Sequence, residues 1–119
     1  MNQSMMELMA EAKAMVTAIA PDEAAQLLAA GTAVALDVRN DNEVAQTGKV
    51  AGAVHIPLDQ VPANHASALD KNKTILLYCA SGGRSAMAGK FLLENGYENV
   101  RNLGGFSEWS NSGGAVEPA

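Results

Sequence analysis

Apolar runs and periodic segments alternate along this chain. Three short runs that are mainly apolar and β-branched, and a fourth segment with apolar ends, have the length of buried strands. They cover residues 34–38, 54–56, 74–78 and 100–103. Before, between and after these segments, apolar residues recur every three or four positions, which predicts helices or helical turns. These cover residues 4–19, 22–30, 41–48, 63–68, 85–95 and 106–110. The alternation predicts one α/β domain with a mainly parallel sheet and helices on both faces.

The two ends of the chain stand apart from this alternation. Ser4 is placed as the N-cap of the first helix, with Glu7 completing a capping box, and five of the six methionines precede residue 16. This methionine stripe either packs on the chain's own core, which we favour, or forms a docking or dimer surface. From Ser112 onward the residues are small or proline and predict a flexible tail. We expect an N-terminal helical extension at 1–16, a domain at 17–111 and a tail at 112–119.

Composition narrows the class of protein. Of the 119 residues, 48% are hydrophobic and 18% are charged, as in a globular domain. The net charge of −5 argues against general binding of nucleic acid, which requires a basic face.

The N-terminus lacks a secretory pattern, and no segment has the roughly 20 apolar residues that span a bilayer. The single cysteine excludes an intrachain disulfide and fits a reducing compartment. We therefore expect a cytoplasmic monomer or homodimer that does not bind membranes.

Cys79 is the residue best placed for chemistry. It directly follows the apolar run 74–78, and four small residues separate it from Arg84. These are Ala80, Ser81, Gly82 and Gly83. In open α/β sheets ligands bind where strands end, and glycines allow a tight turn whose N–H groups surround an anion. The predicted helix start at Ser85 and the charge of Arg84 add positive potential there.

This setting predicts a thiolate at Cys79. A free thiol with a pKa of about 8.5 is only about 3% ionised at pH 7, whereas a pKa about two units lower leaves mostly thiolate. We expect the pKa of Cys79 to lie below about 7. A lone cysteine is more often a buried, inert side chain. The strand end, the Gly-Gly turn and the following arginine together favour a nucleophile instead.

Residues 78–85, Tyr-Cys-Ala-Ser-Gly-Gly-Arg-Ser, resemble the active-site loop of single-domain rhodaneses. Two further stretches resemble signatures of that family, in the same order and spacing. The upstream stretch comprises residues 36–39, Glu43, Gly48 and residues 52–58, and the downstream stretch comprises residues 102–109. The resemblance extends from about residue 17 to 111. Lys49 and Val44 depart from the His and the aromatic residue that are common in the family.

The resemblance implies a five-stranded, mostly parallel sheet and a sulfurtransferase mechanism. Cys79 would take a sulfane sulfur from thiosulfate or a persulfide and pass it, as a persulfide, to a thiophilic acceptor such as cyanide or a thiol. The loop amides would hold the outer sulfur, from Ala80, Ser81, Gly82, Gly83, Arg84 and Ser85. The family implies neither a metal nor an organic cofactor. The alternative is a persulfide carrier or interaction module that exchanges sulfur with a protein partner and turns over small donors slowly.

Loop length separates this family from phosphatases of the same architecture. Those enzymes have five residues between the cysteine and the arginine, which makes a cradle wide enough for a phosphoryl group. Here there are four, and the smaller ring suits a single sulfur atom. A phosphatase also needs a general acid for its leaving group, and the sequence around the loop offers no obvious one. These features disfavour a phosphatase or an arsenate reductase.

The other polar candidates are assigned structural roles. We expect Asp37 to accept hydrogen bonds from loop amides and Arg39 to pair with Glu43. His55 lies in a predicted strand and His65 on a predicted surface turn. Neither histidine is expected to act as a catalytic base.

Overall fold

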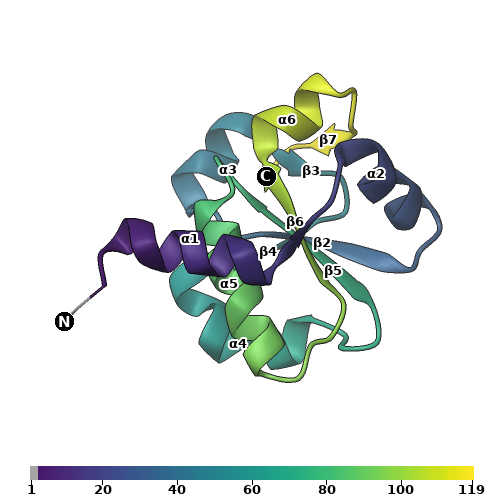
Figure 1. Ribbon diagram of the computed structural model, residues 1–119. Coiled ribbons are helices and arrows are strands. Elements are labelled where there is room, and N and C mark those ends of the chain that lie inside the picture. Colours follow the sequence, from purple (N-terminus) through teal and green to yellow (C-terminus); the bar gives the residue numbers. More distant parts are fainter. Residues whose placement is uncertain (1–2) are drawn as a thin grey trace.

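Five strands form the central sheet of the computed structural model, which describes residues 3–119 (Figure 1). Their order across the sheet is β1-β6-β5-β2-β4. Their bounds are Thr17–Ala18 for β1, Ala33–Asp37 for β2, Val54–His55 for β4, Thr74–Cys79 for β5 and Val100–Gly105 for β6. Every neighbouring pair is parallel, which confirms the architecture that the sequence predicts. β5 lies in the middle of the sheet, which explains why its sequence is apolar throughout.

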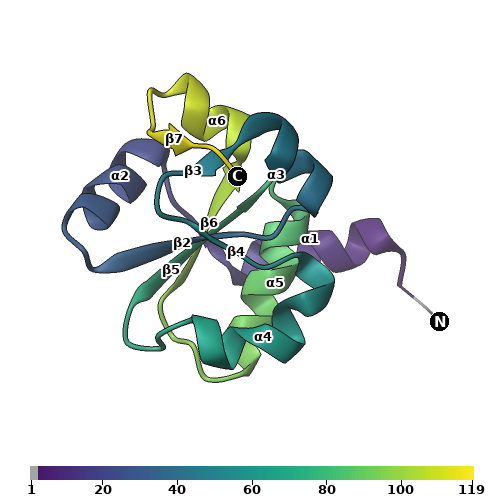
Figure 2. The same ribbon diagram turned by 180° about the vertical axis from the view of Figure 1, so that it is seen from behind.

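Helices cover both faces of this sheet (Figures 1 and 2). On one face lie α1 (Met5–Met15), α4 (Val61–Ala68) and α5 (Gly83–Glu94), and on the other lie α2 (Pro21–Ala29) and α6 (Phe106–Asn111). α3 (Asp41–Thr47) and the short 3-10 helix η1 (Leu58–Gln60) lie in the connections on either side of β4. Among the described residues, none of the helices combines the length and the hydrophobicity that crossing a bilayer requires.

Side chains of β5 alternate between two apolar cores. Ile75, Leu77 and Cys79 face the core that α4 and α5 cover, whereas Leu76 and Tyr78 face the core that α2 and α6 cover. This alternation is the normal geometry of a strand. It places the Cys79 side chain on the α5 side of the sheet, where the next helix begins.

The N-terminal helix is shorter than the sequence predicts. α1 ends at Met15, and Thr17–Ala18 pair with β6 as an edge strand, so the predicted helix over 4–19 is wrong in its last turn. Ser4 is the N-cap as predicted, and its Oγ accepts a hydrogen bond from the Glu7 amide at 3.2 Å. The main-chain hydrogen bonds of the sheet outweigh a periodicity that continues past the helix end.

The methionine stripe of α1 is divided between core and surface. Ala12 is buried, and the Met9 thioether packs against the start of α5, where a Cβ built on Gly83 would lie 3.0 Å from Sδ. Met5 and Met6 at the outer end are 58% and 82% exposed, and Met15 at the inner end is 49% exposed. The middle of the stripe packs on the chain's own fold, as we favour from the sequence, and the two ends remain exposed.

The C-terminal segment packs on the domain, whereas the sequence predicts a flexible tail from residue 112. β7 (Val116–Glu117) pairs antiparallel with β3 (Lys49–Val50). The buried Trp109 donates its indole N–H to the Ala115 carbonyl at 2.9 Å, and Lys49 Nζ lies 2.7 Å from Glu117 Oε1. A composition of small residues does not reveal these partners, which are distant in sequence.

Candidate active site

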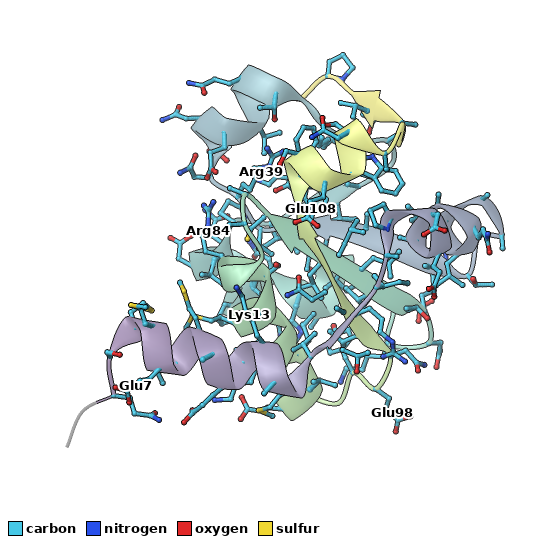
Figure 3. All side chains as sticks on the ribbon, turned by 45° about the horizontal axis from the view of Figure 1, so that its top comes forward. Glu7, Lys13, Arg39, Arg84, Glu98 and Glu108 are labelled. Atoms are coloured by element: carbon cyan, nitrogen blue, oxygen red, sulfur yellow. The ribbon has the colours of Figure 1, made fainter. Side chains whose placement is uncertain are left out.

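Cys79 is the last residue of β5, at the carboxyl end of the central strand. Its side chain is buried, with 1% of its surface exposed. Figure 3 shows Arg39 from the loop after β2, Arg84 from α5 and Glu108 from α6 gathered at this end of the sheet, whereas Glu98 lies at the opposite end. The carboxyl ends of parallel strands are where α/β sheets bind ligands. The structure therefore brings the predicted nucleophile to the expected edge.

The turn after Cys79 is tighter than the sequence predicts. α5 begins at Gly83, two residues before the predicted start, so only Ala80, Ser81 and Gly82 lie between strand and helix. Gly82 is the N-cap with a φ of 97°, a left-handed conformation that glycine adopts without steric cost. The first turn of a twelve-residue helix thus lies directly against the thiol, with its unpaired N–H groups on that side.

Hydrogen-bond donors surround Cys79 Sγ. The Gly82 amide donates to it at 3.0 Å, and the Ser85 hydroxyl lies 3.6 Å away. Burial raises the pKa of the Cys79 thiol, but hydrogen bonds from the Ser85 hydroxyl and from the amides of Ser85, Ser81 and Gly82 outweigh burial. The pKa of Cys79 is therefore lowered, in the direction that the sequence predicts.

The pH dependence of alkylation tests how far this pKa is lowered. Alkylation proceeds through the thiolate, so the rate falls with pH as Cys79 becomes protonated. We expect the midpoint of the rate profile with iodoacetamide to lie below that of an unperturbed cysteine, whose pKa is about 8.5. A short peptide containing one cysteine serves as the control. A midpoint at about 8 or above would contradict the geometry described here.

Arg84 is held by a carboxylate from α3. Its two terminal nitrogens donate to the two oxygens of Glu43 at 2.6 and 2.8 Å. The hydrogen bonds from Arg84 lower the pKa of Glu43 to about 2, although burial opposes them. Glu43 is fixed in turn by the capping box with Asn40 at the start of α3. Arg84 is therefore part of an ion pair with Glu43 beside the loop. The sequence predicts only its positive charge near Cys79.

Arg39 has a different partner from the one expected. It forms a buried ion pair with Asp37, with Nη2 2.7 Å from Oδ2, whereas the sequence predicts pairing with Glu43. Its guanidinium also donates to the Thr47 hydroxyl and the Gly48 carbonyl, both at 2.8 Å. Asp37 additionally accepts from the Arg39 amide at 2.9 Å. The pair ties the end of β2 to the end of α3, the helix that carries Glu43.

Asn102 also belongs to the site. From the sequence it is only the first residue of the downstream stretch 102–109, with no predicted role of its own. Its side chain hydrogen-bonds the Ser85 hydroxyl, the Gly82 carbonyl and the Gly104 amide. The signal in the sequence is weak, because the predicted strand 100–103 contains two polar residues, Arg101 and Asn102. Asn102 adds β6 to the elements that support the loop.

Two open grooves flank the loop. One, of about 280 Å³, has Ala80 in its wall with Phe106, Ser107 and Gln46. The other, of about 360 Å³, has Arg84 in its wall with Leu58 and other residues. The Glu43–Arg84 pair contributes one side chain to each groove, so both grooves adjoin the residues around Cys79.

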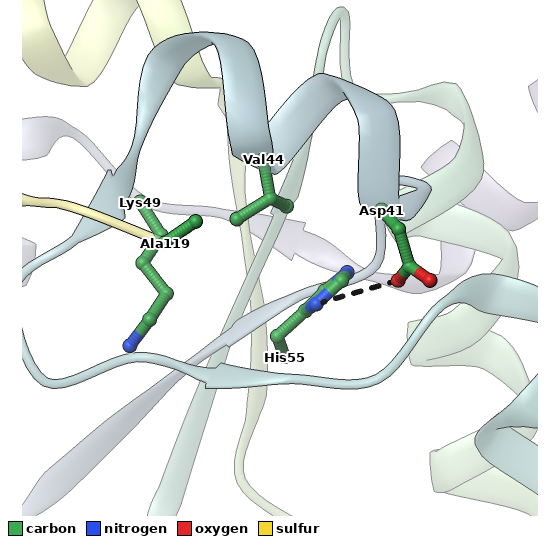
Figure 4. A pocket seen from close by; sticks show the side chains of 5 residues that line it. All are labelled: Asp41, Val44, Lys49, His55 and Ala119. Atoms are coloured by element: carbon green, nitrogen blue, oxygen red, sulfur yellow. Dashed lines mark ion pairs between the residues drawn. The ribbon is translucent and has the colours of Figure 1, made fainter.

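The two histidines serve other parts of the fold. His55 lines a pocket with Asp41, Val44, Lys49 and Ala119, as Figure 4 shows. Its Nδ1 lies 3.9 Å from Asp41 Oδ1, and its Nε2 contacts the Arg39 carbonyl at 2.7 Å. His65 lies on α4, which includes the helical turns predicted over 63–68, and bonds the Tyr97 hydroxyl at 3.0 Å; it is partly buried and not on the surface as expected. Within residues 3–119, no hydrogen bond joins either histidine to Cys79.

Gly105 leaves room for the loop. A Cβ built there would lie 2.7 Å from the Ala80 carbonyl oxygen, which is closer than real Cβ contacts allow. Its φ of −99° suits any residue, so an alanine would act through this clash alone. We expect Gly105→Ala to displace the loop and lower the alkylation rate of Cys79 at pH 7 by about tenfold or more.

Gly113→Ala is the matched control for this substitution. Its φ of 90° makes alanine strained, but nothing lies within 4 Å of the added Cβ. It should cost about 1 kcal/mol in stability and leave the alkylation rate unchanged. Equal alkylation rates for Gly105→Ala and the unmodified protein would show that the contact with Ala80 does not hold the loop.

Comparison with known proteins agrees with this geometry. The family model of the rhodanese-like domain matches residues 20–112. A sulfurtransferase of Allochromatium vinosum is 36% identical over 66% of this chain and 72% of its own. Thiosulfate sulfurtransferase PspE of Escherichia coli is 40% identical over 61% of this chain and 70% of its own. A Rhodopseudomonas palustris protein of unknown function, described as a possible tyrosine phosphatase, matches with a TM-score of 0.84 and 25% identity over 98% of this chain and 96% of its own.

Proposed function

This chain belongs to the rhodanese-like domain family, and on that premise we propose that it is a sulfurtransferase that carries a sulfane sulfur on Cys79. The observation that carries the proposal is the set of donors around Cys79 Sγ, with the Gly82 amide at 3.0 Å and the Ser85 hydroxyl at 3.6 Å. They favour the thiolate, which is the nucleophilic form of cysteine. Named relatives that are sulfurtransferases support the same conclusion.

The transfer proceeds in two balanced steps. The Cys79 thiolate attacks the outer sulfur of thiosulfate, a new S–S bond forms at Sγ, and sulfite leaves with the electron pair of the broken S–S bond. Cyanide then attacks the outer sulfur of the Cys79 persulfide, thiocyanate leaves, and the thiolate is restored. With a persulfide donor the leaving group is a thiolate in place of sulfite. No net oxidant is needed, because the sulfane sulfur is passed on in the same oxidation state.

The loop supplies the electrostatic stabilisation for both steps. The amides of Ser81, Gly82 and Ser85 bond Cys79 Sγ, and we expect the N–H groups of residues 80–85 to hold the negative charge of the persulfide's outer sulfur. The helix N-terminus adds a positive potential at the same point. Arg84, held by Glu43, closes the loop without presenting a free cation. This arrangement fits a single sulfur atom, with four residues between cysteine and arginine.

A second candidate function is that of a persulfide carrier for a protein partner. The observation in its favour is that α1 presents the exposed Met5 and Met6 while Met9 of the same helix packs against Gly83 in the loop. A partner bound on α1 would lie beside the site. In that case sulfur would load onto Cys79 but leave slowly with small acceptors.

Thiocyanate formation from thiosulfate and cyanide separates the two functions. An enzyme forms many equivalents of thiocyanate for each chain, at a rate that rises with either substrate. A carrier gains one sulfur atom on incubation with a donor but forms little or no thiocyanate, because its sulfur leaves only slowly with small acceptors. Absence of any sulfur on Cys79 after incubation with thiosulfate or with an organic persulfide would contradict both functions.

A further inference from the structure

Asn102 connects the end of β6 to two parts of the loop. Its Nδ2 donates to the Gly82 carbonyl at 3.1 Å, and its Oδ1 accepts from the Ser85 hydroxyl at 2.8 Å. Gly82 and Ser85 are the residues whose amide and hydroxyl approach Cys79 Sγ. One side chain therefore bonds the Ser85 hydroxyl that approaches Sγ and the carbonyl of Gly82, the residue whose own N–H donates to Sγ.

The register of the sheet keeps this side chain in place. Leu77 of β5 pairs with Asn102, but the next residue, Tyr78, pairs with Gly104, so Leu103 has no partner on β5. This irregularity leaves the Gly104 amide to donate to Asn102 Oδ1 at 3.0 Å. Because this bond ties the Asn102 side chain to the backbone two residues later, its side-chain amide group stays directed at the loop.

The Ser85 hydroxyl has one proton and two acceptors. The Asn102 Oδ1 atom has no proton to give, so its 2.8 Å contact requires Ser85 to be the donor. Cys79 Sγ lies 3.6 Å from the same hydroxyl and accepts when it is a thiolate. The proton bonds one acceptor at a time, and Asn102 therefore competes with Cys79 for it. Ser85 is fully buried, so water does not offer a third partner.

We propose that Asn102 is a positioning residue for sulfur transfer, which holds Gly82 beside the nucleophile through the Gly82 carbonyl and sets how far the Ser85 hydroxyl bonds to Cys79. Its consequence for catalysis rests on the proposed function, but its action on the free thiolate does not. In the thiolate form the hydroxyl turns toward Sγ. In the persulfide the negative charge moves to the outer sulfur, and the hydroxyl returns to Asn102.

Asn102→Asp tests this role with little change of shape. The carboxylate still accepts from Ser85 and Gly104, but it cannot donate to Gly82, and it places a negative charge behind the hydroxyl. We expect the midpoint of the alkylation profile of Cys79 to rise by about 1 pH unit, and the rate at pH 7 to fall by up to about tenfold. Asn99→Asp, an exposed change just before the start of β6, is the matched control and should leave the profile unchanged.

A second set of variants distinguishes positioning from a merely structural role. Ser85→Ala is made alone, with Asn102→Ala and with Asn102→Asp, and the shift of the alkylation midpoint is measured in each background. Without the competing amide, the hydroxyl bonds only Cys79, so we expect the effect of Ser85→Ala to grow with Asn102→Ala. With Asn102→Asp the stronger acceptor holds the hydroxyl, so the effect should shrink. These two changes have opposite signs, which a general loss of stability would not produce.

Alkylation needs no sulfur donor, so this experiment fails or succeeds independently of the proposed function. Thermal unfolding of each variant shows whether it is folded at the assay temperature. Equal effects of Ser85→Ala in all three backgrounds, or an Asn102→Asp midpoint within about 0.2 pH units of the unmodified protein, would overturn the role of Asn102. Loss of sulfur loading with normal alkylation profiles would contradict the proposed function alone.

Discussion

Replacing Cys79 with serine is expected to lower thiocyanate formation by at least about a thousandfold. A serine hydroxyl is not ionised at neutral pH and cannot form the S–S bond on which both steps depend. The remaining loop still binds anions, but it has no group that can accept a sulfur atom. Steady-state formation of thiocyanate from thiosulfate and cyanide measures the effect.

Cys79→Ser should fold normally, which makes the result interpretable. The new Oγ occupies nearly the same buried position and can accept from the Gly82 amide. We expect a change in stability of no more than about 1 kcal/mol. Cys79→Ala, with no polar atom at this position, is the second variant. A folded serine variant that retains a tenth or more of the activity would rule out covalent transfer through residue 79.

Replacing Asp37 with alanine is expected to destabilise the fold by about 3–5 kcal/mol. Asp37 is 0% exposed and Arg39 only 2%, and the carboxylate meets the guanidinium through Nε at 3.0 Å and Nη2 at 2.7 Å. Without Asp37, a buried positive charge has no counter-charge, and its desolvation is no longer compensated. Urea unfolding, followed by the fluorescence of the single, buried Trp109, gives the free energy.

The double variant Asp37→Ala, Arg39→Met provides the control. Removing both charges leaves none uncompensated, so we expect it to be more stable than Asp37→Ala by at least about 1 kcal/mol. Asp37→Asn, which keeps the shape and removes the charge, replaces the alanine variant if that does not fold. A cost below about 1 kcal/mol for Asp37→Ala would show that the ion pair does not hold β2 to α3.

The local features of the site were predictable because neighbouring residues create them. An apolar strand ends at Cys79, small residues follow, and a helix starts, so the sequence itself places a thiol beside a helix N-terminus. That this thiol carries a sulfur atom was inferred only from the family resemblance. The order of strands and helices likewise follows from apolar patterns of a few residues each, and the parallel sheet of the structure agrees with it.

Several side-chain partners were not predictable, because they lie far apart in the sequence. Arg84 and Glu43 are 41 positions apart, and Asn102 and Ser85 are 17 positions apart. The sequence offers Arg39 two carboxylates, Asp37 and Glu43, and burial selects the nearer one. The C-terminal strand follows the same rule, since the Lys49–Glu117 contact bridges 68 positions. Only the folded chain shows which side chains meet.

Intact-mass spectrometry of the protein after incubation with thiosulfate and removal of the excess tests the central claim most directly. The account predicts a gain of one sulfur atom, located in the peptide of residues 74–84 that contains the only cysteine, and lost again on addition of cyanide with release of thiocyanate. Cys79→Ser should show no gain. An unmodified mass in the wild type with both thiosulfate and an organic persulfide, or a sulfur atom that remains bound to Cys79→Ser, would contradict the account.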